Sequence, residues 1–319
     1  MNYNYYSPEG TLWRSHENTS YISSISGLER AMREGKILEG IAFLCDEELN
    51  LHVDLCGLKG IIPREECVFV NEGEQIKDIA IITRVGKPVC FKVRSIDPDG
   101  DTYRVMLSRR DAQVECRSYY LSSLVAGDII PAAITHLDTF GAFLDVGCGV
   151  SSLLSIDCIS VSRISHPADR LYNGQRLHVV VKFNDLESGR IYVSLKELLG
   201  TWEENARSLS AGQTVSGIVR SVENYGIFVE LAPNLAGLAE HRTDNPALSS
   251  IKTGECVSVY IKSIIPEKMK IKLILIDASE TANERAPISY FTNVSSVTHI
   301  NRWVYSPSKC PKVIETIFE

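Results

Sequence analysis

The chain has 319 residues, of which 44% are hydrophobic and 23% charged, a composition typical of a soluble globular protein with two or three domains. Its formal net charge of −7 excludes a protein that coats nucleic acid through bulk positive charge, so any nucleic-acid site has to be local. No apolar stretch reaches the roughly 18 residues of a spanning helix, and the N-terminus lacks a signal-peptide pattern. We therefore expect a cytoplasmic protein with no membrane partner.

The motifs of metal binding and catalysis are missing from the sequence. Nine cysteines are scattered without a CxxC pair, which favours reduced thiols buried as small apolar residues and predicts no metal site. Neither HExxH nor GxSxG occurs, and the histidines have no partners at ligand spacing. We expect no catalytic residues and no cofactor, and so a binding protein rather than an enzyme.

The first 26 residues match nothing else in the chain and form an N-terminal extension, 1–26. A first unit follows at 27–112, with GKILEGIAFLCDEELNLHVDL beginning at Gly35 and GKPVCFKVR at Gly86. The sequence Ser26-Gly-Leu-Glu29 is a capping pattern, which predicts a short helix that starts at Ser26. Apolar and polar residues alternate along the unit, which indicates half-buried β-strands.

Two further units resemble each other closely. The second spans 113–200 and the third 201–278, and GDIIPAAITHLDTFGAFLDV from Gly127 aligns without a gap with GQTVSGIVRSVENYGIFVEL from Gly212. Their second halves correspond as well, at GQRLHVVVK from Gly174 and GECVSVYIK from Gly254. Several short strands punctuated by glycines predict a small closed barrel for each unit.

Short helices are predicted between the units. Capping patterns start at Ser108 and at Ser194, and the second would begin one amphipathic helix through SLKELLGTWEENARSLSAG. The apolar side of that helix should pack on a barrel through Leu195, Leu198, Leu199, Trp202, Ala206 and Leu209. The C-terminal extension, 279–319, mixes β-branched and aromatic residues with prolines, and either adds strands that cover a barrel edge or contacts a partner.

The repeated pattern, with [FY]-G-x-F in the first half and RIYVSLK from Arg190 in the second, resembles the S1 RNA-binding domain. The resemblance implies an all-β fold of three tandem five-stranded OB-fold barrels of the S1 type, joined by short helices. As a whole the chain is similar to short bacterial homologues of ribosomal protein S1. This implies binding of single-stranded RNA, in particular messenger RNA, in translation, with the small ribosomal subunit as a further partner. The alternatives are a factor in non-ribosomal RNA metabolism or transcription, and a protein-interaction scaffold of OB barrels.

Aromatic residues occupy the motif positions in the second and third units, as Phe140 and Phe143 and as Tyr225 and Phe228. Residues three apart face opposite sides of a regular strand. We expect Gly141 to take a positive φ in a bulge, which would bring both rings to one surface where RNA bases can stack. The alternative is that the rings belong to the core of a small barrel.

The first unit departs from this pattern. Leu49, Asn50 and His52 stand in the positions of the aromatic motif, so the stacking pair is absent. We therefore expect this degenerate unit to bind RNA weakly or to serve as a docking domain. The histidine that the family usually carries is replaced by Ser155 in the second unit, and His241 lies one residue from that position in the third.

Basic residues recur at matching strand positions in the three units and are expected to contact the RNA backbone. Any outward strand position also tolerates lysine or arginine, but the threefold recurrence favours a role in binding. Asp185 can orient an arginine or accept from a 2′-OH, or it is a turn residue. The predicted RNA-binding set is Arg94, Arg104, Phe140, Phe143, Lys182, Asp185, Arg190, Tyr225, Phe228, His241, Lys262, Lys268, Lys270 and Lys272.

Overall fold

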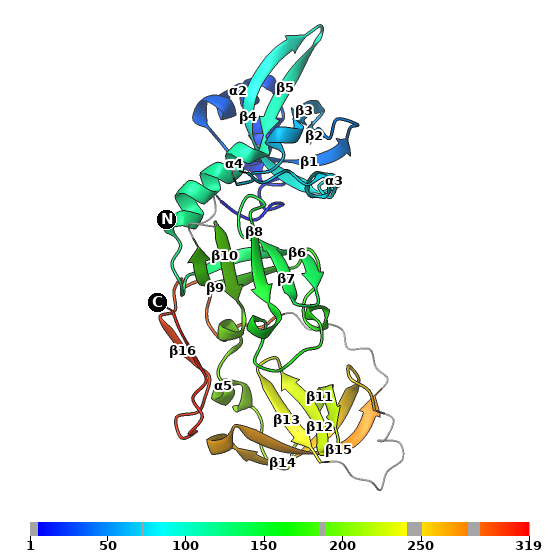
Figure 1. Ribbon diagram of the computed structural model, residues 1–319, viewed down its shortest axis with the longest axis vertical. Coiled ribbons are helices and arrows are strands. Elements are labelled where there is room, and N and C mark those ends of the chain that lie inside the picture. The colour runs from blue at the N-terminus through cyan, green and yellow to red at the C-terminus, as the bar shows by residue number, and fades with distance from the viewer. Residues whose placement is uncertain (1–5, 72, 186–188, 241–250, 280–287, 319) are drawn as a thin grey trace.

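The computed structural model describes residues 6–71, 73–185, 189–240, 251–279 and 288–318. In this part of the chain, three closed five-stranded barrels follow one another along the long axis of the molecule (Figure 1). The expected all-β fold with closed five-stranded barrels is confirmed. All nine cysteines are free thiols, and six of them are buried.

The first barrel has the strand order β1-β2-β3-β5-β4. Its strands are β1 (Leu38–Cys45), β2 (Leu51–Leu55), β3 (Leu58–Ile62), β4 (Pro88–Asp99) and β5 (Thr102–Ser108). The 3₁₀ turn η1 (Arg64–Glu66) and the helix α3 (Asp78–Ile82) lie between β3 and β4. Apolar residues from alternate strand positions fill the interior, among them Leu51, Val53, Phe91, Val105 and Leu107.

Two helices precede this barrel, α1 (His16–Ile22) and α2 (Ile25–Glu34). The predicted helix start at Ser26 is wrong by two residues, because the side chain of Ser24 accepts the hydrogen bond from the Gly27 N–H and caps α2. Both serines could supply a capping oxygen, and the local chain path decides between them.

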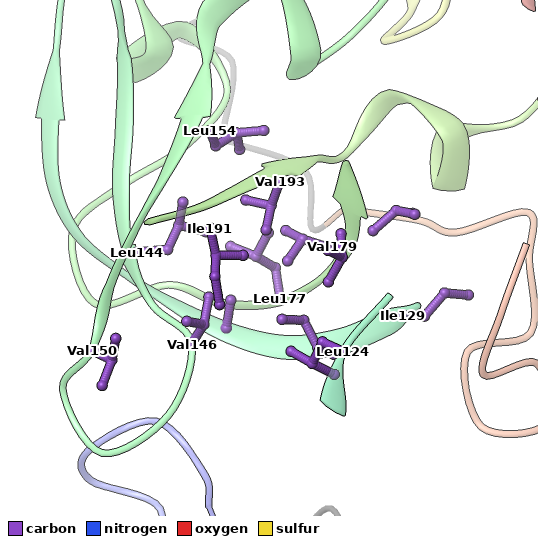
Figure 2. Packing of buried hydrophobic residues seen from close by; sticks show 14 of the residues in the cluster. Leu124, Ile129, Leu144, Val146, Val150, Leu154, Leu177, Val179, Ile191 and Val193 are labelled. Atoms are coloured by element: carbon purple, nitrogen blue, oxygen red, sulfur yellow. The ribbon is translucent and has the colours of Figure 1, made fainter. Parts of the chain in front are cut away.

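The second barrel has the order β10-β8-β7-β6-β9. Its strands are β6 (Ile129–Asp138), β7 (Gly141–Asp145), β8 (Ser151–Ser155), β9 (Arg176–Asp185) and β10 (Arg190–Ser194). Figure 2 shows how its interior is filled by leucine, isoleucine and valine side chains that converge from all sides, including Leu144, Leu154, Val179 and Val193. The 3₁₀ turns η4 (Ile156–Cys158) and η5 (Pro167–Asp169) lie between β8 and β9.

The first connection between barrels is α4 (Arg109–Glu115), which continues into the π-helical turn η2 (Cys116–Tyr120) and the 3₁₀ turn η3 (Leu121–Ser123). As predicted, Ser108 caps this helix by accepting from the Asp111 N–H at 2.9 Å. The N-terminal extension strengthens the same junction. The buried carboxylate of Glu9 accepts two hydrogen bonds from Arg109, at 2.6 and 3.0 Å, and the Glu9 N–H donates to Asp145 at 2.7 Å.

The third barrel has the order β11-β12-β13-β15-β14. Its strands are β11 (Thr214–Glu223), β12 (Gly226–Ala232), β13 (Leu235–Ala239), β14 (Cys256–Ile265) and β15 (Lys270–Ser279), with the 3₁₀ turn η8 (Pro266–Lys268) before the last. Val219, Val229, Val257, Val259 and Ile261 are fully buried in its core.

The single linker helix predicted from Ser194 is wrong. Gly200, at φ 82°, separates the 3₁₀ turn η6 (Lys196–Leu199) from the short helix α5 (Trp202–Ala206). Thr201 and Glu204 form a capping box that starts α5 afresh. The apolar residues of this linker pack on barrels as expected, but on two barrels and not one. Leu195, Leu198 and Leu199 join the core of the second barrel. Trp202, Ala206 and Leu209 pack in the core of the third barrel.

The C-terminal extension runs beside the second and third barrels (Figure 1). Its strands β16 (Arg302–Val304) and β17 (Glu315–Ile317) form a separate two-stranded sheet. The Ile129 N–H at the start of β6 donates to Thr298 O at 2.9 Å, and Trp303 and Tyr305 are buried in the core of the third barrel. In its described residues the extension therefore covers barrel surfaces, with an isolated antiparallel bridge between Asp128 and His299, and neither β16 nor β17 joins a barrel.

Candidate nucleic-acid interface

The hairpin between β6 and β7 carries Phe140 and Phe143. Thr139 and Phe140 form its loop, and His136 lies opposite Phe143 in the paired strands. Phe143 points outward because its neighbours Ala142 and Leu144 are fully buried inside the barrel. Phe140 is 49% exposed, and the two ring centroids lie 5.8 Å apart with the planes at 88°. Both rings therefore reach one outer surface.

The predicted reason for this arrangement is wrong. Gly141 is not among the glycines with positive φ, and it lies in regular pairing with Asp138 and Ser155. The rings share a surface because Phe140 belongs to the turn and only Phe143 to the strand. Glycine is needed for a different reason, since a Cβ at Gly141 would lie 2.4 Å from the carbonyl oxygen of Leu154.

The hairpin between β11 and β12 carries the same pair of rings in the third barrel, but here the glycine of the motif, Gly226, has a positive φ of 153°, unlike Gly141. Glu223 lies opposite Gly226, which places Tyr225 in the loop, where it is 64% exposed. The ring centroids of Tyr225 and Phe228 lie 6.2 Å apart, again with the planes at 88°. A Cβ at Gly226 would lie 2.6 Å from the carbonyl oxygen of Ala239. The same pair of rings, one exposed and one half-buried, is thus built twice.

A row of outward side chains crosses the second barrel at the level of Phe143. Direct pairing runs from His136 to Phe143, then to Leu153, Tyr192 and Phe183. The rings of His136 and Phe143 are stacked at 6.3 Å. We call these five residues the outer row. His136, Tyr192 and Phe183 were missed in the sequence. Tyr192 alternates with buried Ile191 and Val193, but alternation alone would place His136 and Phe183 inward, and register shifts in the strand pairing turn them outward.

Arg190 and Asp185 lie opposite each other at the end of the β9–β10 hairpin. Arg190 precedes Tyr192 by two residues, so it faces the same side of β10. Lys182 lies where the β9–β10 register shifts, and its Nζ donates to Cys158 Sγ at 3.4 Å. A hydrogen bond from Ser155 lowers the pKa of Asp157, and the charge of Lys182 acts in the same direction. Arg190 thus flanks the outer row, and Lys182 is directed toward η4.

The third barrel places lysines where the second has Arg190 and Tyr192. Lys270 and Lys272 are exposed on β15, with Lys272 opposite Leu238, the residue that also pairs with Phe228. Lys262 is exposed at the register shift between Ile261 and Ser263 of β14. Lys268, the third lysine of the predicted set in this segment, lies in the turn η8 and not on β15.

In the first barrel the predicted basic contacts are engaged with carboxylates. Arg94 donates to both oxygens of Asp111, at 2.5 and 2.7 Å, and to Glu66 at 3.2 Å. The hydrogen bond to Asp111 raises the pKa of Arg94. Arg104 donates to Asp99 at 3.0 Å. Arg94 therefore joins β4 to α4.

The aromatic hairpin is absent from the first barrel, as the sequence predicts. His52 occupies the register position of Phe143, opposite Leu44 and Ile61. It forms a 3.0 Å hydrogen bond with Asp46, whose pKa is lowered by that bond. Leu49 takes the loop position with φ 65°.

His241 falls in 241–250, outside the described residues. Within the described ranges, no three His, Cys, Asp or Glu side chains gather as metal ligands. No helix in those ranges is long and apolar enough to cross a membrane.

Residues 124–196, which contain the second barrel, match the family model described as the S1 RNA binding domain. The closed barrel and its aromatic hairpin agree with this match, so residues 124–196 are similar to an S1 RNA binding domain. The chain's expected resemblance to ribosomal protein S1 homologues is confirmed by two relatives. It is 32% identical over 237 residues to the small ribosomal subunit protein bS1 of Leuconostoc lactis, covering 70% of this chain and 52% of that protein. It is 33% identical over 262 residues to the small ribosomal subunit protein bS1 homolog of Bacillus cereus, covering 78% of this chain and 65% of that protein.

The chain thus spans between about half and two thirds of the length of these relatives. Among solved structures, a multidomain protein with nucleic acid binding domains from Streptococcus pneumoniae is 16% identical and covers 78% of this chain and 76% of that one. The TM-score of 0.24 is low.

Proposed function

We propose that the protein binds single-stranded RNA through the aromatic hairpins of its second and third barrels. The observation that carries this proposal is a pair of perpendicular rings at the same place on two barrels, in which exposed Phe140 and Tyr225 lie against half-buried Phe143 and Phe228. A ring whose face is exposed to water offers a stacking surface for any base, worth about 1–3 kcal/mol per base.

Positive charge next to these rings holds the RNA backbone. Arg190 serves the second barrel, and Lys270 and Lys272 serve the third, with Lys268 and Lys262 beside them. Because the whole chain carries a net charge of −7, this local concentration of cations is what attracts a polyanion. Asp185, opposite Arg190, orients that guanidinium or accepts from a 2′-OH.

The first barrel positions the other two. It lacks the aromatic hairpin, and its Arg94 is bound by Asp111 and Glu66. The N-terminal extension links it to the second barrel, because Glu9 forms a buried ion pair with Arg109 and donates its N–H to Asp145. We further propose that the RNA is messenger RNA and that the chain acts in translation at the small ribosomal subunit. The names of the relatives as small ribosomal subunit proteins support this role.

The test is a titration of fluorescently labelled RNA followed by anisotropy. A single strand should bind in the micromolar range, more weakly as salt rises, and a duplex of the same sequence should bind less well because its bases are already stacked. Equal affinity for both forms, or no binding of the single strand, would reject base stacking and favour a protein-interaction scaffold.

A further inference from the structure

A second pair of aromatic rings lies on the second barrel, away from the hairpin motif. Phe183 in β9 and Tyr192 in β10 are directly opposite each other, with ring centroids 6.4 Å apart and planes at 30°. Phe183 is 56% exposed. A large aromatic ring left in water at this level gives up most of its hydrophobic stabilisation, so the pair needs a reason to be there.

Closing the barrel is not that reason. The corresponding pair in the third barrel is Ser263 opposite Lys272, and in the first barrel it is Ser95 opposite Met106. Both of those barrels close with the same strand order. The aromatic pair is therefore specific to the second barrel, because the corresponding strands of the other two barrels pair without one.

The pair lies in line with the hairpin rings. Leu153 of β8 is paired with Phe143 on one side and with Tyr192 on the other, so two strand spacings, about 10 Å, separate the aromatic groups. A cation stands beside the pair, since Arg190 lies about 7 Å before Tyr192 on the same face of β10. Rings with a cation beside them suit a chain of bases joined by phosphates.

We infer that Phe183 and Tyr192 form a second base-stacking platform, so that the second barrel holds RNA mainly by its bases. The third barrel has Lys272 at the place of Tyr192 and holds RNA more by its phosphates. This division of roles rests on the proposed RNA binding and adds a site outside the hairpin motif.

The decisive variant is Phe183→Ser with Tyr192→Met, which installs the neutral pair that the first barrel already carries and leaves the charge unchanged. Single-stranded RNA affinity should fall about tenfold, as expected when one base can no longer stack. The matched control is Tyr172→Ser, a ring of similar exposure (50%) in the same barrel that lies outside the outer row. Its affinity should equal that of the unaltered protein.

A second readout does not depend on affinity. In Phe183→Trp the indole should be quenched when single-stranded RNA is added, whereas in Tyr172→Trp it should not. Absence of quenching at position 183, or unchanged affinity in the Ser–Met variant while Phe140→Ala with Phe143→Ala binds weakly, would overturn the second platform and leave the proposed function standing. If the unaltered protein binds no RNA, the proposed function itself fails and this inference with it.

Discussion

Arg170 of the second barrel and Glu230 of the third form a bidentate ion pair, with Nη1 and Nη2 donating to the carboxylate at 2.9 and 2.7 Å. Their side chains are 7% and 5% exposed. Arg220 donates to the same carboxylate from Nε at 2.7 Å. The two barrels that carry aromatic hairpins are thus fixed to each other by a buried charge cluster, which sets the spacing of their RNA sites.

Arg170→Ala should loosen this junction. Removing one partner of a buried ion pair lowers the free energy of unfolding by about 3–5 kcal/mol. We expect the lower end of this range because Arg220 still neutralises Glu230. Affinity should fall for RNA long enough to reach both barrels and stay the same for short oligonucleotides, because only the long ligand gains from tethering. The exposed Arg207→Ala is the control. Equal losses for long and short RNA would contradict the role of the junction.

The N-terminal junction should make stability depend on pH through Glu39. Its buried carboxylate accepts from the backbone N–H groups of Gly10, Leu12 and Trp13. Burial raises the pKa of Glu39 to about 7, against the lowering effect of the Trp13 bond, and the charge of Glu9 adds to the rise. A carboxyl group with a raised pKa stabilises the folded state most when protonated, so its contribution is lost as pH rises from about 4.5 through 7.

Glu39→Gln should remove this dependence, because the amide oxygen still accepts but does not titrate. Urea unfolding at pH 5, 6 and 7 should show a shallower fall in the free energy of unfolding, by up to about 1.4 kcal/mol per pH unit for one proton. Burial raises the pKa of Asp145 to about 7 as well, so some fall with pH remains. The exposed Glu48→Gln should leave the slope as it was, and an unaltered slope in Glu39→Gln would refute the assignment.

The lysines of β15 should determine the salt dependence. Lys270→Ala with Lys272→Ala removes two proposed phosphate partners, so the slope of log affinity against log salt should become shallower by roughly 0.7 for each phosphate that is no longer neutralised. Lys309→Ala with Lys312→Ala changes the net charge equally on the exposed C-terminal extension and should leave the slope unchanged. If both double variants shift the slope alike, the effect comes from net charge and not from direct binding of phosphates.

The sequence was sufficient for the features that depend on local pattern. Alternation and the repeat predict the barrels, and the motif predicts that Phe140 and Phe143 share one surface, although not the hairpin turn that brings them there. Ser108 was identified as a helix cap from its neighbours alone. These properties are set within a few residues, and the resemblance to a known domain supplies the strand connections.

Features that depend on pairing between distant strands were not predictable. The outer row exists because closure of the barrel puts β8 beside β10, which brings Leu153 to Tyr192 across a parallel pair. Likewise, nothing in the local sequence links Glu9 to Arg109, one hundred positions away. The positive φ at Gly200 overrides a helical pattern that continues on both sides of it.

The most direct test of RNA binding by the hairpin rings compares two double variants. Phe140→Ala with Phe143→Ala removes one proposed stacking pair, and Tyr103→Ala with Tyr172→Ala removes two exposed rings elsewhere. The first variant should bind single-stranded RNA at least about tenfold more weakly with an unchanged thermal unfolding midpoint, and the second should bind like the unaltered protein. Full RNA affinity in the Phe140 and Phe143 variant would contradict base stacking on these hairpins.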